Sequence, residues 1–293
     1  MKKLQGVITA LPTPFCQDGS LDKNALKKFV DFQIENGITA LLPVGTTGES
    51  PTLTHEEHAE VIRLVIEQTA GRVPVICGTG SNSTAEAVSM TKQAAADGAD
   101  YSLQVTPYYN KPGQEGIYRH FTAIADASPI PIILYNIAGR TGRNIETETV
   151  ARLAEHPNIV GVKEASGSIA QAMDVIHSVP EDFMVFSGDD SLALPTVAVG
   201  GDGIISVASN VIPQAMTEFT SAALTGDWET ARRYNKKYAS LFQKLFIDTN
   251  PVPVKYALAR MGWMEEVYRL PLCPMNDNCK AILDAVLKEL DLI

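Results

Sequence analysis

Short apolar runs alternate along this chain with longer stretches in which apolar positions recur every three or four residues. The short runs are rich in Val, Ile, Leu and Tyr and end at turn residues, which is typical of buried β-strands. The longer stretches predict helices, and one strand–helix unit follows another at intervals of roughly 25 to 35 residues. The predicted strands cover residues 6–10, 40–44, 74–78, 101–106, 131–135, 159–163, 183–187 and 203–207.

Helix-start signals agree with this interpretation. Thr54 with Glu57, and Ser83 with Glu86, have the spacing of a capping box, in which both side chains satisfy backbone N–H groups at a helix start. Eight strand–helix units without a long linker predict an α/β fold, a (β/α)8 TIM barrel over residues 1–225. The alternative is a doubly wound open sheet, which usually has fewer strands and a glycine-rich first turn that residues 9–14 lack.

The pattern changes after residue 225. Residues 227–244, 254–261 and 278–290 predict helices, and prolines at positions 251, 253, 271 and 274 separate them. We therefore expect a C-terminal helical extension, residues 226–293, packed against the barrel.

The composition argues against several classes of protein. The 293 residues carry 24 Lys and Arg against 34 Asp and Glu, a net charge of −10, so neither nucleic acid nor an anionic membrane is an expected partner. No apolar run is long enough to span a membrane, and the basic first residues lack the apolar segment of a signal peptide, so we expect a cytoplasmic protein. The cysteines, expected as free thiols, are Cys16, Cys77, Cys273 and Cys279.

Lys163 is unusual because it ends an apolar strand with a charge. Burial lowers the pKa of a lysine, and the neutral amine is then a nucleophile that can form a Schiff base. Tyr135 ends the preceding strand, and its phenol can carry the proton that imine formation moves. Each residue alone also fits a plain role, as a solvated charge or a packed core tyrosine. Glu164 should face away from Lys163, because neighbouring residues of a strand alternate.

The other strand ends favour amine chemistry over metal chemistry. None of the five histidines ends a strand, and only Asp189 and Asp190 offer adjacent acids, one of which a helix N-cap explains. The loop 45–48, Gly-Thr-Thr-Gly, is either a tight turn before a helix or a nest of N–H groups that holds a carboxylate. Arg140 is either a surface charge or a clamp for a second carboxylate.

Five motifs occur in order across nearly the whole chain. They are Gly-Thr-Thr-Gly-Glu at 45–49, Thr-Pro-Tyr-Tyr-Asn-Lys-Pro at 106–112, Tyr-Asn at 135–136 with Arg-Thr-Gly at 140–142, Gly-Val-Lys-Glu-Ala at 161–165, and Asn-Pro-Val-Pro-Val-Lys at 250–255. Together they resemble the dihydrodipicolinate synthase family of pyruvate-dependent class I aldolases, which also includes N-acetylneuraminate lyase. Ala138-Gly139 departs from the family, which usually has a proline and then a small residue there.

The resemblance implies a lyase without a cofactor or metal, in which Lys163 forms an imine with pyruvate. The enamine would attack L-aspartate 4-semialdehyde, and cyclisation would give 4-hydroxy-tetrahydrodipicolinate in lysine (diaminopimelate) biosynthesis. It also implies a proton relay of Tyr135, Thr47 and Tyr109, with Tyr109 supplied by a second subunit. Arg140 would bind the carboxylate of the semialdehyde. The residues implied to border the substrates are Thr46, Thr47, Arg140, Gly188 and Ile205.

The same resemblance implies a homotetramer that L-lysine inhibits at a dimer interface. Glu86 also has a plain explanation in the Ser83 capping box, and two of the histidines have one in an ordinary helix start. The positions that match the lysine-sensitive pattern are Ser50, His55, His58, Asn82, Glu86 and Tyr108.

Three other functions stay open at this point. Another pyruvate-dependent aldolase or lyase, acting on a sugar or sialic keto acid, would not require a carboxylate clamp at Arg140. A non-catalytic sensor of keto acids or lysine would form no adduct that borohydride can trap. A phosphate-binding barrel that uses the loop 78–80 is the most distant alternative.

Overall fold

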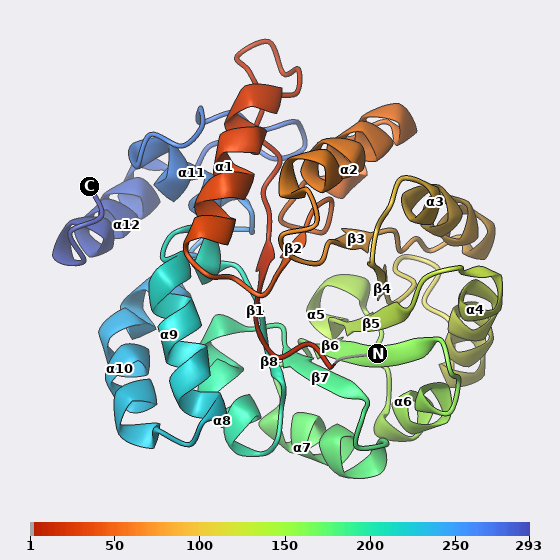
Figure 1. Cartoon of the computed structure of the whole chain (residues 1–293). Helices are drawn as coiled ribbons and strands as arrows, with labels where there is room; N and C mark the ends of the chain where they lie inside the picture. The colour runs from red at the N-terminus through yellow and green to blue at the C-terminus, as the bar shows by residue number, and fades with distance from the viewer. Residues whose placement is uncertain (1–2) are drawn as a thin grey trace.

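The computed structural model describes residues 3–293 as a ring of parallel strands surrounded by helices (Figure 1). The strands pair in the order β2-β1-β8-β7-β6-β5-β4-β3, and a parallel bridge between Leu41 and Val75 joins β2 to β3 and closes the ring. The (β/α)8 prediction is therefore confirmed, and the predicted strand ends differ from the observed ones by at most two residues. The strands are β1 (Gly6–Ala10), β2 (Ala40–Leu42), β3 (Ile76–Gly78), β4 (Tyr101–Val105), β5 (Ile132–Asn136), β6 (Ile159–Glu164), β7 (Met184–Ser187) and β8 (Gly203–Ser206).

Helices follow each strand and cover the outside of the ring. The barrel helices are α1 (Lys23–Glu35), α2 (His55–Thr69), α3 (Thr84–Ala96), α4 (Gln114–Ala127), α5 (Ala138–Thr141), α6 (Thr147–Ala154), α7 (Ile169–Ser178), α8 (Ala193–Ala198) and α9 (Pro213–Leu224). Short 3-10 turns, η1 (Ser50–Thr52), η2 (Asp190–Leu192) and η3 (Ala208–Asn210), lie in the loops after β2, β7 and β8.

The strands bury side chains on both faces, as parallel strands covered by helices do. Inside the ring, alternate residues of the strands form one cluster, which includes Ile8, Leu42, Ile133, Phe186 and Ile205. Outside the ring, the other residues of the same strands pack against the helices in two larger clusters. The interior of the barrel is therefore filled, and any site has to lie at an end of the ring.

The C-terminal segment forms α10 (Trp228–Lys244), α11 (Val252–Arg260) and α12 (Asp277–Glu289), close to the predicted helices. These helices lie beside α9 and α1 (Figure 1), and they share one apolar cluster with the barrel, to which Leu241, Leu258 and Leu287 contribute. Helix α11 is buried from Val252 to Leu258. A domain boundary between residues 225 and 226 stays a prediction, because the helical segment and the barrel share this core.

One of the two predicted capping boxes is complete. Thr54 Oγ1 accepts from the Glu57 N–H, and the Glu57 carboxylate accepts from the Thr54 N–H. Ser83 caps α3 through the N–H of Glu86, but the Glu86 carboxylate is turned to the Ser81 hydroxyl and to His55. The explanation of Glu86 as a reciprocal capping residue is therefore wrong, since its carboxylate bonds the Ser81 hydroxyl and not the Ser83 N–H.

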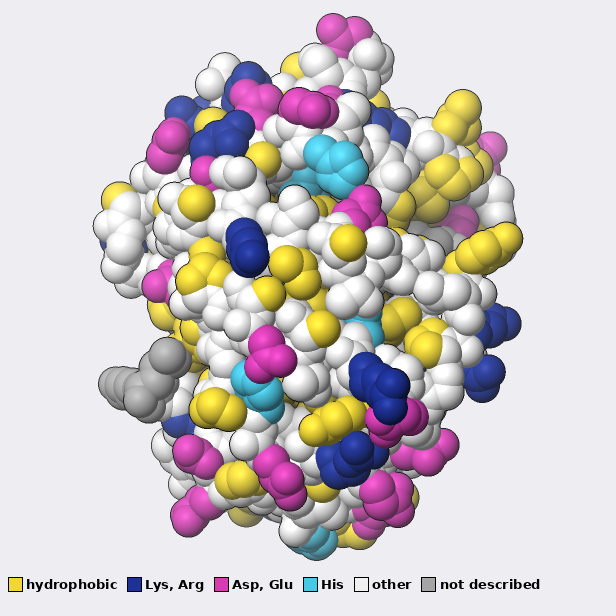
Figure 2. Space-filling model, turned by 90° about the vertical axis from the view of Figure 1, so that its right-hand side faces the viewer, with side chains coloured by type: hydrophobic (Ala, Val, Ile, Leu, Met, Phe, Trp, Pro, Cys, Tyr) yellow, Lys and Arg dark blue, Asp and Glu magenta, His cyan; other side chains and the backbone are white. Residues whose placement is uncertain are grey.

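The side of the molecule that carries α3 and α4 has basic and acidic side chains interspersed, with histidines and small apolar groups between them (Figure 2). Over residues 3–293, no helix has the length and apolar character needed to cross a membrane. All four cysteines are free thiols, of which Cys77 is buried and Cys273 is exposed.

Candidate active site

Lys163 and Tyr135 lie side by side at the ends of β6 and β5, as the sequence predicts. The two residues are partners in the parallel register, and the Lys163 Nζ lies 4.4 Å from the centre of the Tyr135 ring. Lys163 is only 6% exposed. Burial lowers the pKa of Lys163 from an ordinary 10.5 to about 8, with Asp190 opposing the shift and Arg140 adding to it. A useful fraction of this amine, roughly a tenth at pH 7, is therefore neutral and nucleophilic.

The Lys163 amine has no ion-pair partner within residues 3–293. Glu164, the adjacent acid, faces out of the ring, where it accepts hydrogen bonds from the Asn136 amide at 3.0 Å and the Ser166 N–H at 2.7 Å. The predicted alternation of the two side chains is therefore confirmed. Since no carboxylate pairs with Lys163, burial is the dominant influence on its pKa.

Gly188 lies directly against Lys163. A Cβ atom at this position would lie 3.0 Å from the Lys163 Cε and 2.6 Å from the Ala165 Cβ. A larger residue would push the lysine stem aside, so the glycine leaves the space that the amine needs.

Asp189 and Asp190 play different parts after β7. Asp189 caps the short turn η2 by accepting from the Ser191 N–H at 2.8 Å, which confirms the N-cap expectation for one of the two acids. Asp190 is buried and accepts from the Ser206 hydroxyl and from the N–H groups of Val207 and Ala208. Burial raises the pKa of Asp190 to about 6 despite these donors.

The surroundings of Tyr135 keep its hydroxyl group protonated. Burial raises the pKa of its hydroxyl to about 12, while a hydrogen bond with the Thr46 side chain opposes that shift. The phenol therefore keeps its proton at neutral pH. Its partner is Thr46, whereas the predicted relay had Thr47 in this place.

The loop between β2 and η1 has an unusual backbone. Val44 and Glu49 both adopt left-handed conformations, with φ of 50° and 53°. Such angles are uncommon for residues other than glycine and are rarest for β-branched residues such as Val44. Gly48 fits against this turn, because a Cβ there would lie 3.0 Å from the Val44 Cα. The loop turns Thr46 and Thr47 toward the strand ends, and the Thr47 hydroxyl accepts from the Asn250 amide at 3.1 Å.

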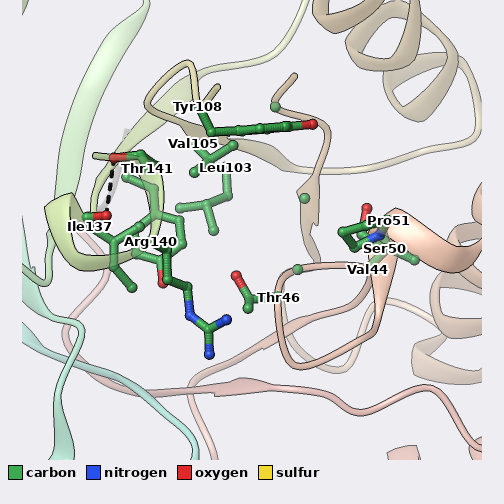
Figure 3. A pocket seen from close by; sticks show the side chains of 14 residues that line it. Val44, Thr46, Ser50, Pro51, Leu103, Val105, Tyr108, Ile137, Arg140 and Thr141 are labelled. Atoms are coloured by element: carbon green, nitrogen blue, oxygen red, sulfur yellow. Dashed lines mark hydrogen bonds between the residues drawn. The ribbon is translucent and has the colours of Figure 1, made fainter. Parts of the chain in front are cut away.

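Arg140 comes from the short helix α5, which Ala138 and Gly139 begin. Its Nη2 donates to the backbone carbonyl of Asn250 at 3.0 Å, which fixes one edge of the guanidinium group. Figure 3 shows the guanidinium of Arg140 and the side chain of Thr46 on the same side of the pocket. The family departure at positions 138–139 therefore still leaves Arg140 at the pocket.

Two adjoining cavities open at this end of the barrel, with volumes of about 230 and 50 Å³. Thr46, Tyr135 and Arg140 line both, so the two are parts of one site. The larger cavity also has Ser50 and Tyr108 in its wall (Figure 3), and the smaller one has Lys163, Gly188 and Thr47. A small polar substrate can therefore reach the lysine through the larger cavity.

The C-terminal segment adds two residues to this wall that the sequence analysis missed. Phe246 and Asn250 both come from the C-terminal segment and line the smaller cavity. Ile205 is fully buried within the barrel cluster and lies outside the cavity linings described above; Val207 of the same strand end lines the smaller cavity instead. The Asn-Pro-Val-Pro-Val-Lys motif at 250–255 is the one sequence signal that could have indicated a contribution of the C-terminal segment to the site.

Tyr109 does not reach this cavity in the single chain. Its side chain is 90% exposed, and its backbone φ of 67° lies in the left-handed region. The neighbouring Tyr108 is partly exposed and lines the larger cavity.

The residues expected to bind lysine fall into two groups. His55, His58 and Glu86 line a third cavity, of about 510 Å³, between α2 and α3, where His55 lies 3.3 Å from Glu86. His58 bonds the Gly78 carbonyl, and burial lowers the pKa of this histidine. In the second group, Ser50 and Tyr108 line the active-site cavity, and Asn82 donates to the Tyr108 carbonyl at 3.1 Å. Asn82 lines neither of these two cavities and is connected to the active-site wall through this bond to Tyr108.

A (β/α)8 barrel with a buried, unpaired lysine at a strand end has the architecture of the class I aldolases. Within residues 3–293, no group of three or more His, Cys, Asp or Glu side chains is arranged to hold a metal ion. The model of the dihydrodipicolinate synthetase family matches residues 3–290. The chain therefore belongs to this family.

Individual relatives agree over the full length. The chain is 54% identical to the 4-hydroxy-tetrahydrodipicolinate synthase of Koribacter versatilis over 288 residues, which is 98% of this chain and 96% of the relative. The dihydrodipicolinate synthase from Acinetobacter baumannii, solved in complex with pyruvate, superposes with a TM-score of 0.97 at 45% identity, covering 99% of this chain and 100% of that one. The synthase from Cyanidioschyzon merolae, solved with lysine bound, gives 0.96 at 43% identity, covering 99% of both chains.

Proposed function

We propose that this chain is a lyase that condenses pyruvate with L-aspartate 4-semialdehyde to give 4-hydroxy-tetrahydrodipicolinate, in the pathway to lysine. The observation that carries the proposal is the buried amine of Lys163, with its pKa near 8, beside the protonated phenol of Tyr135. The pyruvate complex of the Acinetobacter baumannii synthase supports the first substrate, and the names of the relatives support the reaction.

The neutral Lys163 Nζ attacks the ketone carbon of pyruvate, and one water molecule leaves as the imine forms. Tyr135, whose ring centre lies 4.4 Å from the Lys163 Nζ, is the proposed group that delivers a proton to the departing oxygen and takes one from the nitrogen. Loss of a methyl proton then converts the imine into an enamine. Its carbon attacks the aldehyde of the second substrate, and the substrate amine closes the ring as the Lys163 amine is released.

We assign proton transfer to Tyr135 and Thr46, and to Tyr109 from a second copy of the chain. Thr46 takes the place of Thr47 because the Tyr135 hydroxyl bonds Thr46, while Thr47 is engaged with Asn250. The 90% exposure of Tyr109 fits a side chain that acts in a neighbouring subunit. We retain the homotetramer as the proposed assembly, which sedimentation analysis of the purified protein tests directly.

Arg140 is the proposed ligand of the semialdehyde carboxylate. A guanidinium fork suits bidentate binding of a carboxylate, and the Asn250 carbonyl holds it at the cavity. An aldolase for sugar keto acids would not need this clamp. The Arg140→Ala variant should raise the KM for L-aspartate 4-semialdehyde by roughly 10- to 100-fold, because it removes a hydrogen bond to a charged group. The KM for pyruvate should change much less.

The test of the reaction is a comparison of aldehydes with the wild-type enzyme and pyruvate. We expect rapid condensation with L-aspartate 4-semialdehyde and slow or absent reaction with aldose sugars and N-acetylmannosamine. Faster turnover of an aldose would replace this proposal by the sugar keto acid alternative.

We propose that L-lysine binds at the cavity between α2 and α3, which His55, His58 and Glu86 line. The Glu86 carboxylate there, which already accepts from the Ser81 hydroxyl and lies 3.3 Å from His55, is the proposed acceptor for an ammonium group, and the lysine-bound synthase of Cyanidioschyzon merolae supports such an effector. Calorimetric titration with L-lysine should give saturable heat that the Glu86→Ala variant loses. Absence of both heat and inhibition in the wild-type enzyme would remove the effector from the proposal.

A further inference from the structure

Asp190 is a buried acid at the active-site end of the barrel that lines neither of the two adjoining cavities. It is 1% exposed, and no Lys, Arg or His within residues 3–293 forms an ion pair with it. Neutral donors satisfy both oxygens, since Oδ1 accepts from the Ser206 hydroxyl and Oδ2 from the N–H groups of Val207 and Ala208 at 3.1 and 2.9 Å. A buried charge without a cationic partner is costly, which indicates that the charge itself serves a function.

Two neighbours of Lys163 anchor this carboxylate. Gly188, two positions before Asp190, is so close to the lysine stem that a Cβ there would lie 3.0 Å from the Lys163 Cε. Val207, whose N–H Asp190 accepts, lines the smaller cavity together with Lys163. Asp190 is therefore tied to both neighbours of the amine without pairing with it, and its charge opposes the lowering of the Lys163 pKa by burial.

The other ionisable groups around Lys163 supply no negative charge. Tyr135 on β5 keeps its proton, Arg140 on α5 is positive, and the Glu164 carboxylate faces out of the ring. Within residues 3–293, no Asp or Glu side chain lines the smaller cavity. Asp190 therefore balances the positive charge of Arg140, which adds to the lowering of the Lys163 pKa.

We propose that Asp190 acts through Lys163, as a positioning residue whose negative charge stabilises the cationic imine with pyruvate. The inference rests on the proposed function and concerns only its half-reaction with pyruvate. In that half-reaction a C–N bond forms and the ketone C–O bond breaks. The leaving water takes one proton from the nitrogen and one from Tyr135, which solvent then reprotonates. The nitrogen keeps one proton and carries the positive charge.

The effect of the Asp190 charge depends on the form of the lysine. Below its pKa, Lys163 begins as a cation and ends as a cationic imine, so a nearby negative charge stabilises both and changes the rate little. Above its pKa, the amine begins neutral and gains charge as water leaves, so the negative charge accelerates the step. Its three neutral donors hold the carboxylate out of a direct ion pair, which would keep the amine protonated.

Asp190→Asn removes the charge and keeps an oxygen that can accept from the Val207 and Ala208 N–H groups. Timed borohydride trapping with pyruvate alone gives the rate of imine formation at each pH. Between pH 6.5 and 7, the rates of wild type and variant should differ less than about twofold. Above pH 9, the variant should reach a plateau roughly 3- to 10-fold lower, and the pH of its half-maximal rate should fall by the corresponding ~0.5 to 1 unit.

Asp189→Asn is the matched control, because it makes the same exchange one position earlier. The Asp189 side chain caps η2 and is only partly buried, so solvent and salt screen its charge. Burial and, to a smaller extent, the Asp189 charge raise the pKa of Asp190, so removing that charge leaves Asp190 ionised over the measured range. The control should reproduce the wild-type plateau and half-maximal pH.

Two results would overturn the inference. A rate that is lower at every pH, with the wild-type half-maximal pH, would mean that Asp190 only holds the end of β8 in place. A profile identical to that of the wild type would mean that its charge does not act on the imine. Failure of the proposed function is distinguishable from both, because a wild-type enzyme that forms the imine but does not condense the semialdehyde leaves these profiles measurable.

Ser206→Ala decides the question if Asp190→Asn forms no imine at any pH. This variant keeps the carboxylate and its two N–H donors, and it removes only the hydroxyl link to β8. Loss of that donor raises the pKa of Asp190, but the carboxylate should stay ionised above pH 8, where the plateau is measured. A wild-type plateau and half-maximal pH would support the role of the charge. A lower plateau with an unchanged half-maximal pH would show that the link is what matters, and would contradict the inference.

Discussion

Two lysines of this chain are almost completely buried, yet their surroundings differ. Lys163 is 6% exposed and lies over the Tyr135 ring without an ion pair. Lys255 of α11 is 0% exposed, donates to the Glu49 carboxylate, and lies 4.3 Å from the centre of the Phe15 ring. Burial lowers the pKa of both amines, but Glu49 limits the decrease for Lys255. Burial with a partner thus produces a structural cation, and burial without one produces a nucleophile.

The paired lysine also has a structural consequence for the site. Glu49 belongs to the loop that carries the two threonines, and its second oxygen accepts from the Arg269 N–H at 3.2 Å. Arg269 in turn forms two hydrogen bonds with Glu57 at 2.6 Å, which holds the pKa of that carboxyl down to about 2. The C-terminal segment therefore fixes the catalytic loop through Lys255 and Arg269.

Replacement of Lys163 should have the largest effect on the contrast between the two lysines. The Lys163→Arg variant should lose all detectable condensation, because a guanidinium does not form the imine. The Lys163→Met variant should be equally inactive, and more stable than the wild type below about pH 8. Between pH 10.5 and 8, Lys163 binds a proton in the unfolded chain but not in the folded one, so the free energy of unfolding of the wild type decreases as the pH falls through this range. The Met variant has no such group and keeps that stability.

Enzyme assay and thermal unfolding of both variants measure these effects. Condensation at a measurable fraction of the wild-type rate by Lys163→Met would show that another group carries the chemistry.

Tyr135→Phe keeps the buried environment of Lys163 and removes the proton carrier. We expect kcat to fall about 10²- to 10⁴-fold, the usual contribution of a positioned acid–base group. The imine should still form, but more slowly, as single-turnover kinetics with pyruvate would record. An unchanged rate would assign the proton to a different group, with Thr46 as the next to be replaced.

Lys255→Met tests the structural half of the comparison. Removing one partner of a buried ion pair leaves Glu49 as an uncompensated charge, so the free energy of unfolding should fall by about 3 to 5 kcal/mol. The double variant Glu49→Gln with Lys255→Met removes both charges and should recover much of the loss. Denaturant unfolding of the wild type, the single variant and the double variant measures the difference. A double variant as unstable as the single one would show that the unpaired charge of Glu49 is not the cause of the loss.

The pH dependence of imine formation gives a smaller effect. Only the neutral Lys163 amine attacks pyruvate, so the rate should rise about tenfold per pH unit from pH 6 and level off above the pKa of about 8. Stopped-flow mixing with pyruvate records this profile. A rate that keeps rising to pH 10 would indicate an ordinary exposed lysine.

Much of the barrel and of its strand ends follows from the sequence for a physical reason. Parallel strands with both faces buried give apolar runs, and the final residues of such strands meet at one end of the ring. This places Lys163 beside Tyr135 without any knowledge of the structure. The same logic predicted that Glu164 faces the other way.

The sequence could not predict the contacts that join distant segments. Asn250 and Thr47 are more than 200 positions apart, and no periodic pattern relates them. Lys255 ends the motif at 250–255, but nothing in that motif indicates that this lysine is fully buried and paired with Glu49. Thr46 and Thr47 are adjacent in the sequence, and only the structure shows that Tyr135 bonds Thr46.

Borohydride reduction in the presence of pyruvate compares the two lysines in one experiment. Proteolysis followed by mass spectrometry should find the mass of one reduced pyruvate on the peptide that contains Lys163 and leave the peptide that contains Lys255 unmodified. An unmodified Lys163 peptide, or equal labelling of both lysines, would contradict the claim that burial without a partner makes Lys163 the nucleophile.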